Sequence, residues 1–217
     1  MEHHYQTEQE AFWAGRFGDD YVERNQGEAI VAGNLALFSR VLEHTTGVRS
    51  AIEFGANVGM NLMALRALVP GIALSAIEIN QKAVGALEAL GGITVFPQSI
   101  LDYAPACTHD LVLIKGVLIH IHPDQLQRVY ELLYASSARY ICVAEYYNPS
   151  PVELAYRGNR DRLFKRDFAG EMLDRFPGLR LAGYGFRYRR DPNFPQDDIT
   201  WFLLEKTSEI QRHGAPA

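Results

Sequence analysis

Cysteine, long hydrophobic runs and an excess of positive charge are all scarce in this sequence. Cys107 and Cys142 are the only cysteines, and two thiols in or beside apolar runs do not make a disulfide framework. No apolar run approaches membrane-spanning length and no signal-like leader opens the chain, so we expect a soluble, cytoplasmic protein without a membrane partner. Lys and Arg total 21 against 26 Asp and Glu, which makes a nucleic-acid partner unexpected.

The length of 217 residues suits one domain of ordinary size with a buried core. No internal repeat, low-complexity tract or composition shift marks a boundary within it. We therefore predict a single domain over residues 1–217, with a helical lid in residues 1–46 and a flexible tail in residues 206–217.

A glycine turn organises the chain. The apolar run 48–54 ends in Gly55 and Gly59, and a helical pattern then begins. Such a strand, turn and helix start lets backbone approach a ligand closely. A dinucleotide site would need a third glycine where Asn57 stands. With Glu53 at the end of the strand, the turn predicts a zwitterionic ligand without phosphate.

A second acidic position follows the next strand. Residues 74–77 form a short apolar run that ends at Glu78 and Ile79. Glu78 follows Gly59 by about 20 positions, the spacing at which a carboxylate binds ribose hydroxyls in a βαβ unit. We therefore assign Glu78 to the ribose of a nucleoside ligand.

The glycine turn, the acidic end of the second strand and the later apolar runs together resemble class I S-adenosylmethionine-dependent methyltransferases. The resemblance implies a Rossmann-like α/β fold, with a seven-stranded, mostly parallel sheet, helices on both faces and an antiparallel last strand. It also implies S-adenosylmethionine beside the turn and contacts of Ser99 and Ile100 with the adenine. The cofactor-binding residues expected in the body of the fold are Glu53, Gly55, Asn57, Gly59, Glu78, Ile79, Ser99, Ile100 and Lys115.

The first helical segment carries an aromatic stripe among charged residues. One interpretation is a helix that packs its stripe on the domain. The other is a lid, with Trp13 or Tyr21 against the cofactor and Arg24 facing its carboxylate. Lids of this kind exclude water from reactive ligands.

The fourth apolar run, 111–114, leads into a segment with two histidines. Residues beyond the carboxyl ends of parallel strands face the ligand crevice. His120 is the acid–base candidate, because a neutral imidazole can accept a proton near pH 7. His122 precedes a helix that begins at Pro123. No Cys or carboxylate cluster accompanies these histidines, so we expect no metal.

The fifth strand, 140–144, leads to Glu145 and a pair of tyrosines. Aromatic faces attract cations, so Tyr146 and Tyr147 could frame a sulfonium, although one of them could equally pack in the core. Residues 150–168 read as a long, charged loop that covers the substrate. The catalytic candidates in these segments and before them are His120, Glu145, Tyr147, Asn148, Tyr156 and Arg157.

Nearly the whole chain resembles the methylase family associated with pseudaminic acid biosynthesis. The motifs that carry this resemblance are residues 55–59, 115–120, 144–149, 163–168 and 193–198. It implies methyl transfer to an oxygen or nitrogen nucleophile of a sugar or another small metabolite. Asn159 and Arg189 stand where the family pattern has histidines.

A second resemblance is to azetidine-2-carboxylate synthase, which cyclises the amino acid arm of its own S-adenosylmethionine and releases methylthioadenosine. Such an enzyme needs no acceptor beyond S-adenosylmethionine. A third reading is a non-catalytic S-adenosylmethionine-binding module. The sequence leaves these alternatives open.

Overall fold

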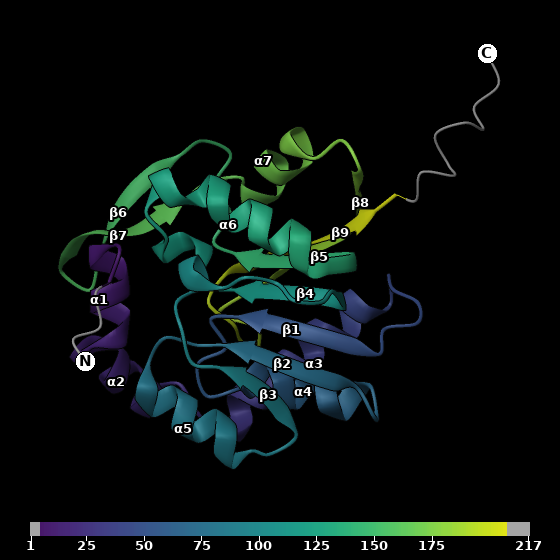
Figure 1. The fold of residues 1–217 in the computed structure, drawn as a ribbon, viewed down its shortest axis with the longest axis horizontal. Helices are drawn as coiled ribbons and strands as arrows, with labels where there is room; N and C mark the ends of the chain where they lie inside the picture. Colours follow the sequence, from purple (N-terminus) through teal and green to yellow (C-terminus); the bar gives the residue numbers. More distant parts are fainter. Residues whose placement is uncertain (1–4, 208–217) are drawn as a thin grey trace.

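The computed structural model describes residues 5–207, and its centre is a seven-stranded sheet (Figure 1). In chain order the strands of this sheet are β1 (Ser50–Phe54), β2 (Ala73–Ile77), β3 (Ile93–Phe96), β4 (His109–Lys115), β5 (Ser137–Glu145), β8 (Leu179–Arg187) and β9 (Ile199–Lys206). They lie across the sheet in the order β3-β2-β1-β4-β5-β9-β8. Neighbours from β3 to β5 are parallel, and β9 is antiparallel to both strands beside it. The predicted Rossmann-like fold is confirmed.

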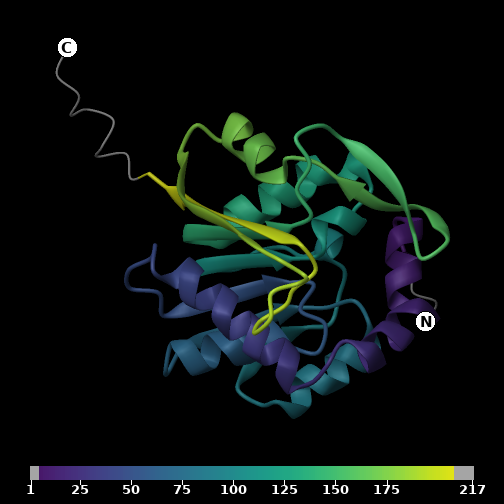
Figure 2. The same ribbon diagram turned by 180° about the vertical axis from the view of Figure 1, so that it is seen from behind.

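Helices cover both faces of this sheet. In chain order the helices of the described residues are α1 (Glu8–Ala14), α2 (Arg16–Arg24), α3 (Glu28–Leu42), α4 (Met60–Leu68), α5 (Gln81–Ala89), α6 (Pro123–Ser136) and α7 (Phe168–Arg175), with short 3-10 turns η1 (Ile100–Asp102) and η2 (Leu118–His120). α6 and α7 lie over one face (Figure 1), and α3 crosses the opposite face beside α4 (Figure 2). α1 and α2 lie across the ends of the strands rather than over a face.

Apolar burial explains the two layers. In β4, Leu111, Val112, Leu113 and Ile114 are all fully buried, as expected for a parallel strand covered on both sides. Val112 and Ile114 belong to the core beneath α6 and α7, whereas Leu111 and Leu113 belong to the core beneath α3 and α4. Because successive side chains of a strand point to opposite faces of the sheet, one apolar run contributes to both cores.

The prediction of a loop over residues 150–168 is wrong. This segment contains a two-stranded antiparallel hairpin, β6 (Val152–Tyr156) and β7 (Asn159–Lys165), and Asp167 then caps α7. The turn places Arg157 and Gly158 at positive φ. The hairpin could not be recognised in the sequence, because most side chains of β6 are exposed and its residues do not alternate between buried and exposed positions.

The predicted lid and tail are each partly corrected. α1 and α2 lie at the strand ends as a lid would, but α3 buries Leu37, Phe38 and Val41 completely and is part of the core. Lys206 belongs to β9, and its ammonium group donates to the carbonyl oxygens of Tyr134 and Ser137. Residues 208–217 lie outside the described part of the chain.

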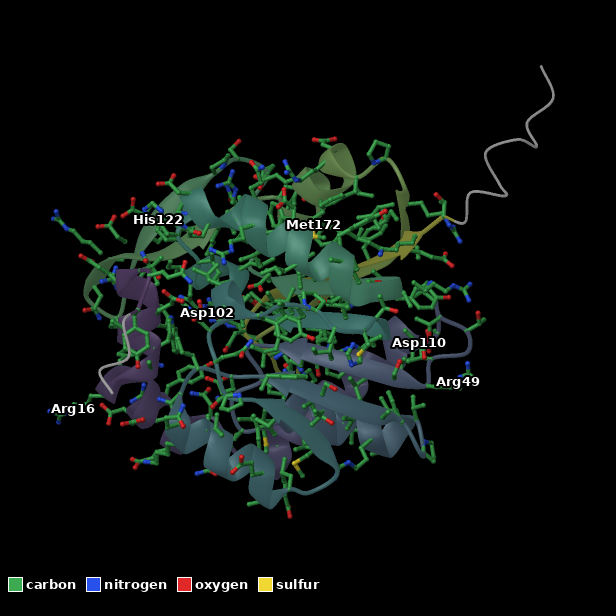
Figure 3. All side chains as sticks on the ribbon, viewed as in Figure 1. Arg16, Arg49, Asp102, Asp110, His122 and Met172 are labelled. Carbon is green, nitrogen blue, oxygen red and sulfur yellow. The ribbon has the colours of Figure 1, made fainter. Side chains whose placement is uncertain are left out.

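The order of strands reverses between β1 and β4, which pair directly. Open α/β sheets bind ligands beyond the carboxyl ends of the strands at such a reversal. Figure 3 labels Asp102 and His122 toward this end of the sheet, and Arg49 and Asp110 at the opposite, amino end. There the backbone N–H of Arg49 donates to the Asp110 carboxylate over 2.9 Å.

The two cores should make the central strand far more sensitive to truncation than the edge. Leu113→Ala in β4 should lower the free energy of unfolding by about 2–5 kcal/mol, because it removes a fully buried side chain and leaves a cavity. Leu181→Ala on the edge strand β8, where the side chain is exposed, should change it by about 0.5 kcal/mol or less. Urea unfolding measures both. Equal losses would contradict the assignment of the two positions.

Candidate active site

A cavity of about 630 Å³ lies beyond the carboxyl ends of β1, β2, β3 and β4, beneath α1, α2 and the β6–β7 hairpin. This volume is within the range of about 300–1,000 Å³ that small-molecule sites occupy. The predicted site residues that line it are Trp13, Tyr21, Gly55, Asn57, Glu78, Ile79, Ser99, Ile100, Lys115, His120, Tyr156 and Arg157. Those that do not line it are Arg24, Glu53, Gly59, Glu145, Tyr147 and Asn148.

Three backbone donors at the start of the glycine turn are already occupied. The N–H groups of Gly55 and Ala56 donate to the Ile77 carbonyl over 2.9 and 3.1 Å, and that of Asn57 donates to Glu78. Gly55 adopts φ 74°, and a Cβ there would lie 2.7 Å from the Val117 side chain. Glycine is therefore needed at position 55 so that Val117 can pack against the turn, and the turn does not offer these N–H groups to a phosphate.

Gly59 has a packing role instead of the predicted ligand contact. Its φ of 80° is left-handed, and a Cβ would lie within 2.9 Å of the side chains of both Leu87 and Leu90. Glycine is needed here so that α5 can pack against the start of α4.

Glu78 is buried at the end of β2 and holds two turns together. One carboxylate oxygen accepts from the Asn57 N–H over 2.7 Å, and the other accepts from the Asn80 N–H over 2.8 Å. Burial raises the pKa of Glu78, while these backbone donors lower it. Each carboxylate oxygen has a second lone pair, so a ligand hydroxyl could still bind.

Ser99 is tied to the N-terminal helix. Its hydroxyl donates to the Glu10 carboxylate and accepts from the Leu101 N–H over 3.0 Å. Glu10 also closes a capping box with Thr7 at the start of α1. Glu10 and Thr7 line the cavity, and our sequence reasoning missed both, although the Thr-x-x-Glu spacing is a recognisable helix-start signal.

Aromatic rings from the lid meet over the cavity. The Trp13 ring lies 5.2 Å from that of Tyr21 and 4.7 Å from that of His120, measured between centroids. His120 in turn lies 4.7 Å from Tyr156 on the hairpin. Burial raises the pKa of Tyr21 to about 12, so its hydroxyl keeps its proton at neutral pH.

Arg24 does not face the cavity as predicted. Its guanidinium lies 5.9 Å from the centroid of the Phe17 ring, and the side chain is outside the cavity lining. Arg157, at the tip of the hairpin, lines the cavity instead.

His120 is buried in η2. Its Nδ1 lies 2.6 Å from the carbonyl oxygen of Arg162 in β7. Burial lowers the pKa of His120 to about 4, against the opposing effect of this hydrogen bond. The imidazole is therefore neutral near pH 7 and only weakly basic.

Glu145 lies behind the cavity and supports η2. Its carboxylate oxygen Oε1 accepts from the N–H groups of Val117 and Leu118, each over 2.9 Å. Burial raises the pKa of Glu145 to about 7. The predicted catalytic contact is replaced by a positioning role, because the side chain points under the loop that carries His120.

Tyr147 and Asn148 lie outside the cavity, on the segment that follows β5. The Tyr147 side chain is exposed, with its ring 5.8 Å from that of Phe202, and the Asn148 amide donates to the Ser150 carbonyl. The neighbouring Tyr146 lines the cavity. The strand alternation places only one of the two tyrosines inward, so the predicted pair around a sulfonium is not formed.

Glu53 is fully buried beneath the cavity floor. The Asn61 amide donates to it, and Asn61 rather than Glu53 lines the cavity. Burial raises the pKa of Glu53 to about 8, while Asn61 and the charge of Lys115 lower it. Burial also lowers the pKa of Lys115, and Glu53, Asp197 and Glu145 oppose that shift.

Asn34 and Gln196 also line the cavity, and of the two only Gln196 belongs to a motif of the sequence, residues 193–198. Asn34 from α3 and Gln196 from the loop before β9 meet in a hydrogen bond of 3.1 Å, although 162 positions separate them. Within residues 5–207, no three His, Cys, Asp or Glu side chains are placed to share a metal ion. In the same range, no helix is long and apolar enough to cross a membrane.

No protein-family model matches the chain, and no curated protein matches it. Its fold is similar to that of several solved methyltransferases. With 1,6-didemethyltoxoflavin-N1-methyltransferase of Burkholderia thailandensis, crystallised with bound 1,6-didemethyltoxoflavin and S-adenosylhomocysteine, the TM-score is 0.67 at 14% identity, covering 92% of this chain and 87% of that one.

Two further structures give comparable likeness. Magnesium protoporphyrin IX methyltransferase from Synechocystis PCC 6803, with bound S-adenosylhomocysteine, has a TM-score of 0.64 at 16% identity, over 91% of this chain and 97% of that one. The plantazolicin methyltransferase BpumL, in complex with S-adenosylhomocysteine, has a TM-score of 0.65 at 12% identity, over 92% and 94%. The chain has the fold of these class I methyltransferases.

The buried Glu53 should make the protein less stable as pH rises. Below about pH 4.5 its carboxyl is protonated in both states. Between pH 4.5 and 8 the unfolded carboxyl ionises while the folded one keeps its proton, so the free energy of unfolding falls; above pH 8 the loss is complete. Glu53→Gln should remove on the order of 3–5 kcal/mol of this decline, measured by urea unfolding at several pH values. The exposed Glu88→Gln is the control, and a parallel decline in wild type and Glu53→Gln would contradict the assignment.

Proposed function

We propose that the protein binds S-adenosylmethionine in this cavity and transfers its methyl group to an oxygen or nitrogen nucleophile of a small molecule. The observation that carries the proposal is that the glycine turn, Glu78 and the Ser99–Ile100 turn line one cavity at the strand-order reversal. The similar structures were crystallised with S-adenosylmethionine or S-adenosylhomocysteine in the same fold.

The residues present fit this ligand. The N–H groups of Gly55, Ala56 and Asn57 are occupied and cannot bind a phosphate, and the Glu78 oxygens can accept from ribose hydroxyls. Ile79 and Ile100 line the same cavity and supply apolar surface for a purine. The Lys115 ammonium, which lines the cavity and makes no ion pair within 4 Å across residues 5–207, can bind a carboxylate.

When bound, S-adenosylmethionine would supply an electrophilic methyl group on a sulfonium. The chain's own residues would enclose it, because Trp13 and Tyr21 from the lid and Tyr156 from the hairpin line the cavity and present aromatic rings. Enclosure excludes water and holds a nucleophile in near-attack geometry, which can remove about 7–11 kcal/mol from a barrier.

The low basicity of His120 favours an amine over a sugar hydroxyl as nucleophile. A hydroxyl must lose its proton as it attacks, and an imidazole whose pKa is about 4 assists that loss poorly near pH 7. An amine needs only to be neutral and correctly placed. This observation also favours a second candidate reaction, the cyclisation of the ligand's own aminobutyrate arm to azetidine-2-carboxylate, whose nucleophile is an amine.

Binding is the first test. Calorimetry should detect S-adenosylmethionine or S-adenosylhomocysteine, and Glu78→Ala should weaken either by tenfold or more, since charge-assisted hydrogen bonds contribute about 1.5–3 kcal/mol each. Because Glu78 also anchors two backbone N–H groups, the variant's unfolding curve must show that it is folded. Glu88→Ala, exposed on α5, should bind as the wild type does. Wild-type protein that binds neither compound would overturn the proposal.

Product analysis separates the candidate reactions. With S-adenosylmethionine alone, a methyltransferase should be silent and should release S-adenosylhomocysteine only after a small amine or sugar is added. Methylthioadenosine together with an azetidine amino acid, above the spontaneous background, would identify the cyclase and overturn methyl transfer. Binding with no product under any condition would identify a non-catalytic module.

A further inference from the structure

The β6–β7 hairpin contacts His120 through its backbone. The carbonyl oxygen of Arg162 in β7 lies 2.6 Å from His120 Nδ1. A carbonyl oxygen can only accept a hydrogen bond, so Nδ1 must carry the proton of this pair. A neutral imidazole has one ring N–H, and burial keeps this ring neutral. Nε2 is then left with a free lone pair.

The free lone pair belongs to a ring that lines the cavity. Across residues 5–207, Nε2 makes no hydrogen bond within the protein. The rings of Trp13 and Tyr156 both pack against the imidazole, each with its centroid 4.7 Å away. These contacts restrict the rotation of the ring. From β5, Glu145 fixes the backbone before His120 by accepting from Val117 and Leu118.

We infer that the β6–β7 hairpin holds His120 in the Nδ1–H tautomer and thereby presents Nε2 to the cavity as the acceptor for an N–H or O–H of the ligand. The hairpin is in this sense part of the site and not only its cover. The tautomer is a property of the protein without ligand. The identity of the ligand group rests on the proposed function.

Leu163 of β7 is buried in the core beneath α6 and α7, and Phe164 is buried beside His122, while α1 holds the neighbouring segment at Arg162. β6 and β7 pair only with each other as a separate two-stranded sheet. The Arg162 guanidinium pairs with Glu8 over 3.1 Å and lies 5.3 Å from the centroid of the Phe12 ring. The Gln9 amide donates to the carbonyl of Asp161, the residue before Arg162, over 3.1 Å. The Arg162 side chain therefore fixes the position of its own carbonyl beneath His120.

The hydrogen bond between the Arg162 carbonyl and His120 couples the position of α1 to the tautomer of His120. With α1 against the hairpin, the Arg162 carbonyl is in place and Nε2 accepts. With the hairpin released, the proton is free to occupy either ring nitrogen, and a proton on Nε2 would turn the acceptor into a donor. A ligand N–H or O–H would then lose its partner.

The tautomer can be read directly by nuclear magnetic resonance. In protein labelled with 15N at its seven histidines, the nitrogen shifts separate protonated from unprotonated ring nitrogens. The His120 signals are those missing in His120→Asn, whose amide can still donate to the Arg162 carbonyl. We expect ligand-free wild type to carry the proton on Nδ1. A proton on Nε2 in the folded wild type would overturn the inference.

Loosening the hairpin provides the second arm. Arg162→Ala should speed backbone hydrogen exchange across β6 and β7 and move the His120 proton toward Nε2, whereas the exposed Arg160→Ala on the same strand should do neither. Unchanged exchange in Arg162→Ala would overturn the role of this side chain. Faster exchange with the Nδ1–H tautomer retained would overturn the role of the hairpin.

The third arm separates this inference from the proposed function. His120→Asn should bind S-adenosylhomocysteine within about twofold of wild type, because the nucleoside contacts are elsewhere, but it should lose at least tenfold in kcat for whichever product the wild type forms. Undiminished kcat would overturn the acceptor role of Nε2. Wild type that shows the Nδ1–H tautomer but binds no nucleoside would overturn the proposed function and leave the tautomer assignment intact.

Discussion

The bond between the Glu78 carboxylate and the Asn57 N–H joins the first two strand turns, and the rest of the site depends on it. Asn57 adopts φ 47°, a conformation that most residues avoid, and its N–H points at the carboxylate instead of at the cavity. Through Asn80, the same carboxylate also starts α5, whose N-cap side chain accepts from Ala83. One buried carboxyl group therefore sets the turn, the strand end and the next helix.

The other strand ends follow the same rule. Glu145 at the end of β5 holds the turn after β4, and Glu53 in β1 holds Asn61 in α4. Each carboxylate reaches across to an element that follows a neighbouring strand or begins the next helix. The loops of the crevice are thus fixed by side chains from below, and the cavity above them stays open for a ligand.

The sequence was sufficient for the parts of the fold that rest on apolar period and glycine. β4 and α4 could be predicted because a run of four apolar residues and a left-handed glycine leave few alternatives. The hairpin could not, because most side chains of β6 are exposed and its position depends on contacts with distant elements, such as the ion pair and the ring contact of Arg162 with α1. Contacts between distant segments, such as Ser99 with Glu10 or Asn34 with Gln196, have no local signature at all.

The site residues that could be predicted from the sequence were likewise those marked by glycine or by spacing along the chain. Positions next to the glycine turn or at a strand end, such as Glu78, could be placed from spacing. Glu53 and Glu145 also stand at strand ends, but their side chains point under the loops, since strand alternation puts them on the core faces. The sequence shows that a carboxylate stands at the end of a strand. Whether its side chain points into the cavity or into the core depends on its position in the alternation of the strand, which the sequence alone does not fix.

Burying Glu53, Glu78 and Glu145 together imposes a cost that a cationic ligand would relieve. Burial raises the pKa of all three, so the fold resists their ionisation, and the charge of Lys115 opposes this shift at Glu53 and Glu145. A ligand carrying a sulfonium and an ammonium adds positive charge above the same floor and favours the ionised carboxylates. The groups that weaken the fold at neutral pH are therefore those that would strengthen binding of a cation, and such a ligand would restore part of the stability lost in the free protein.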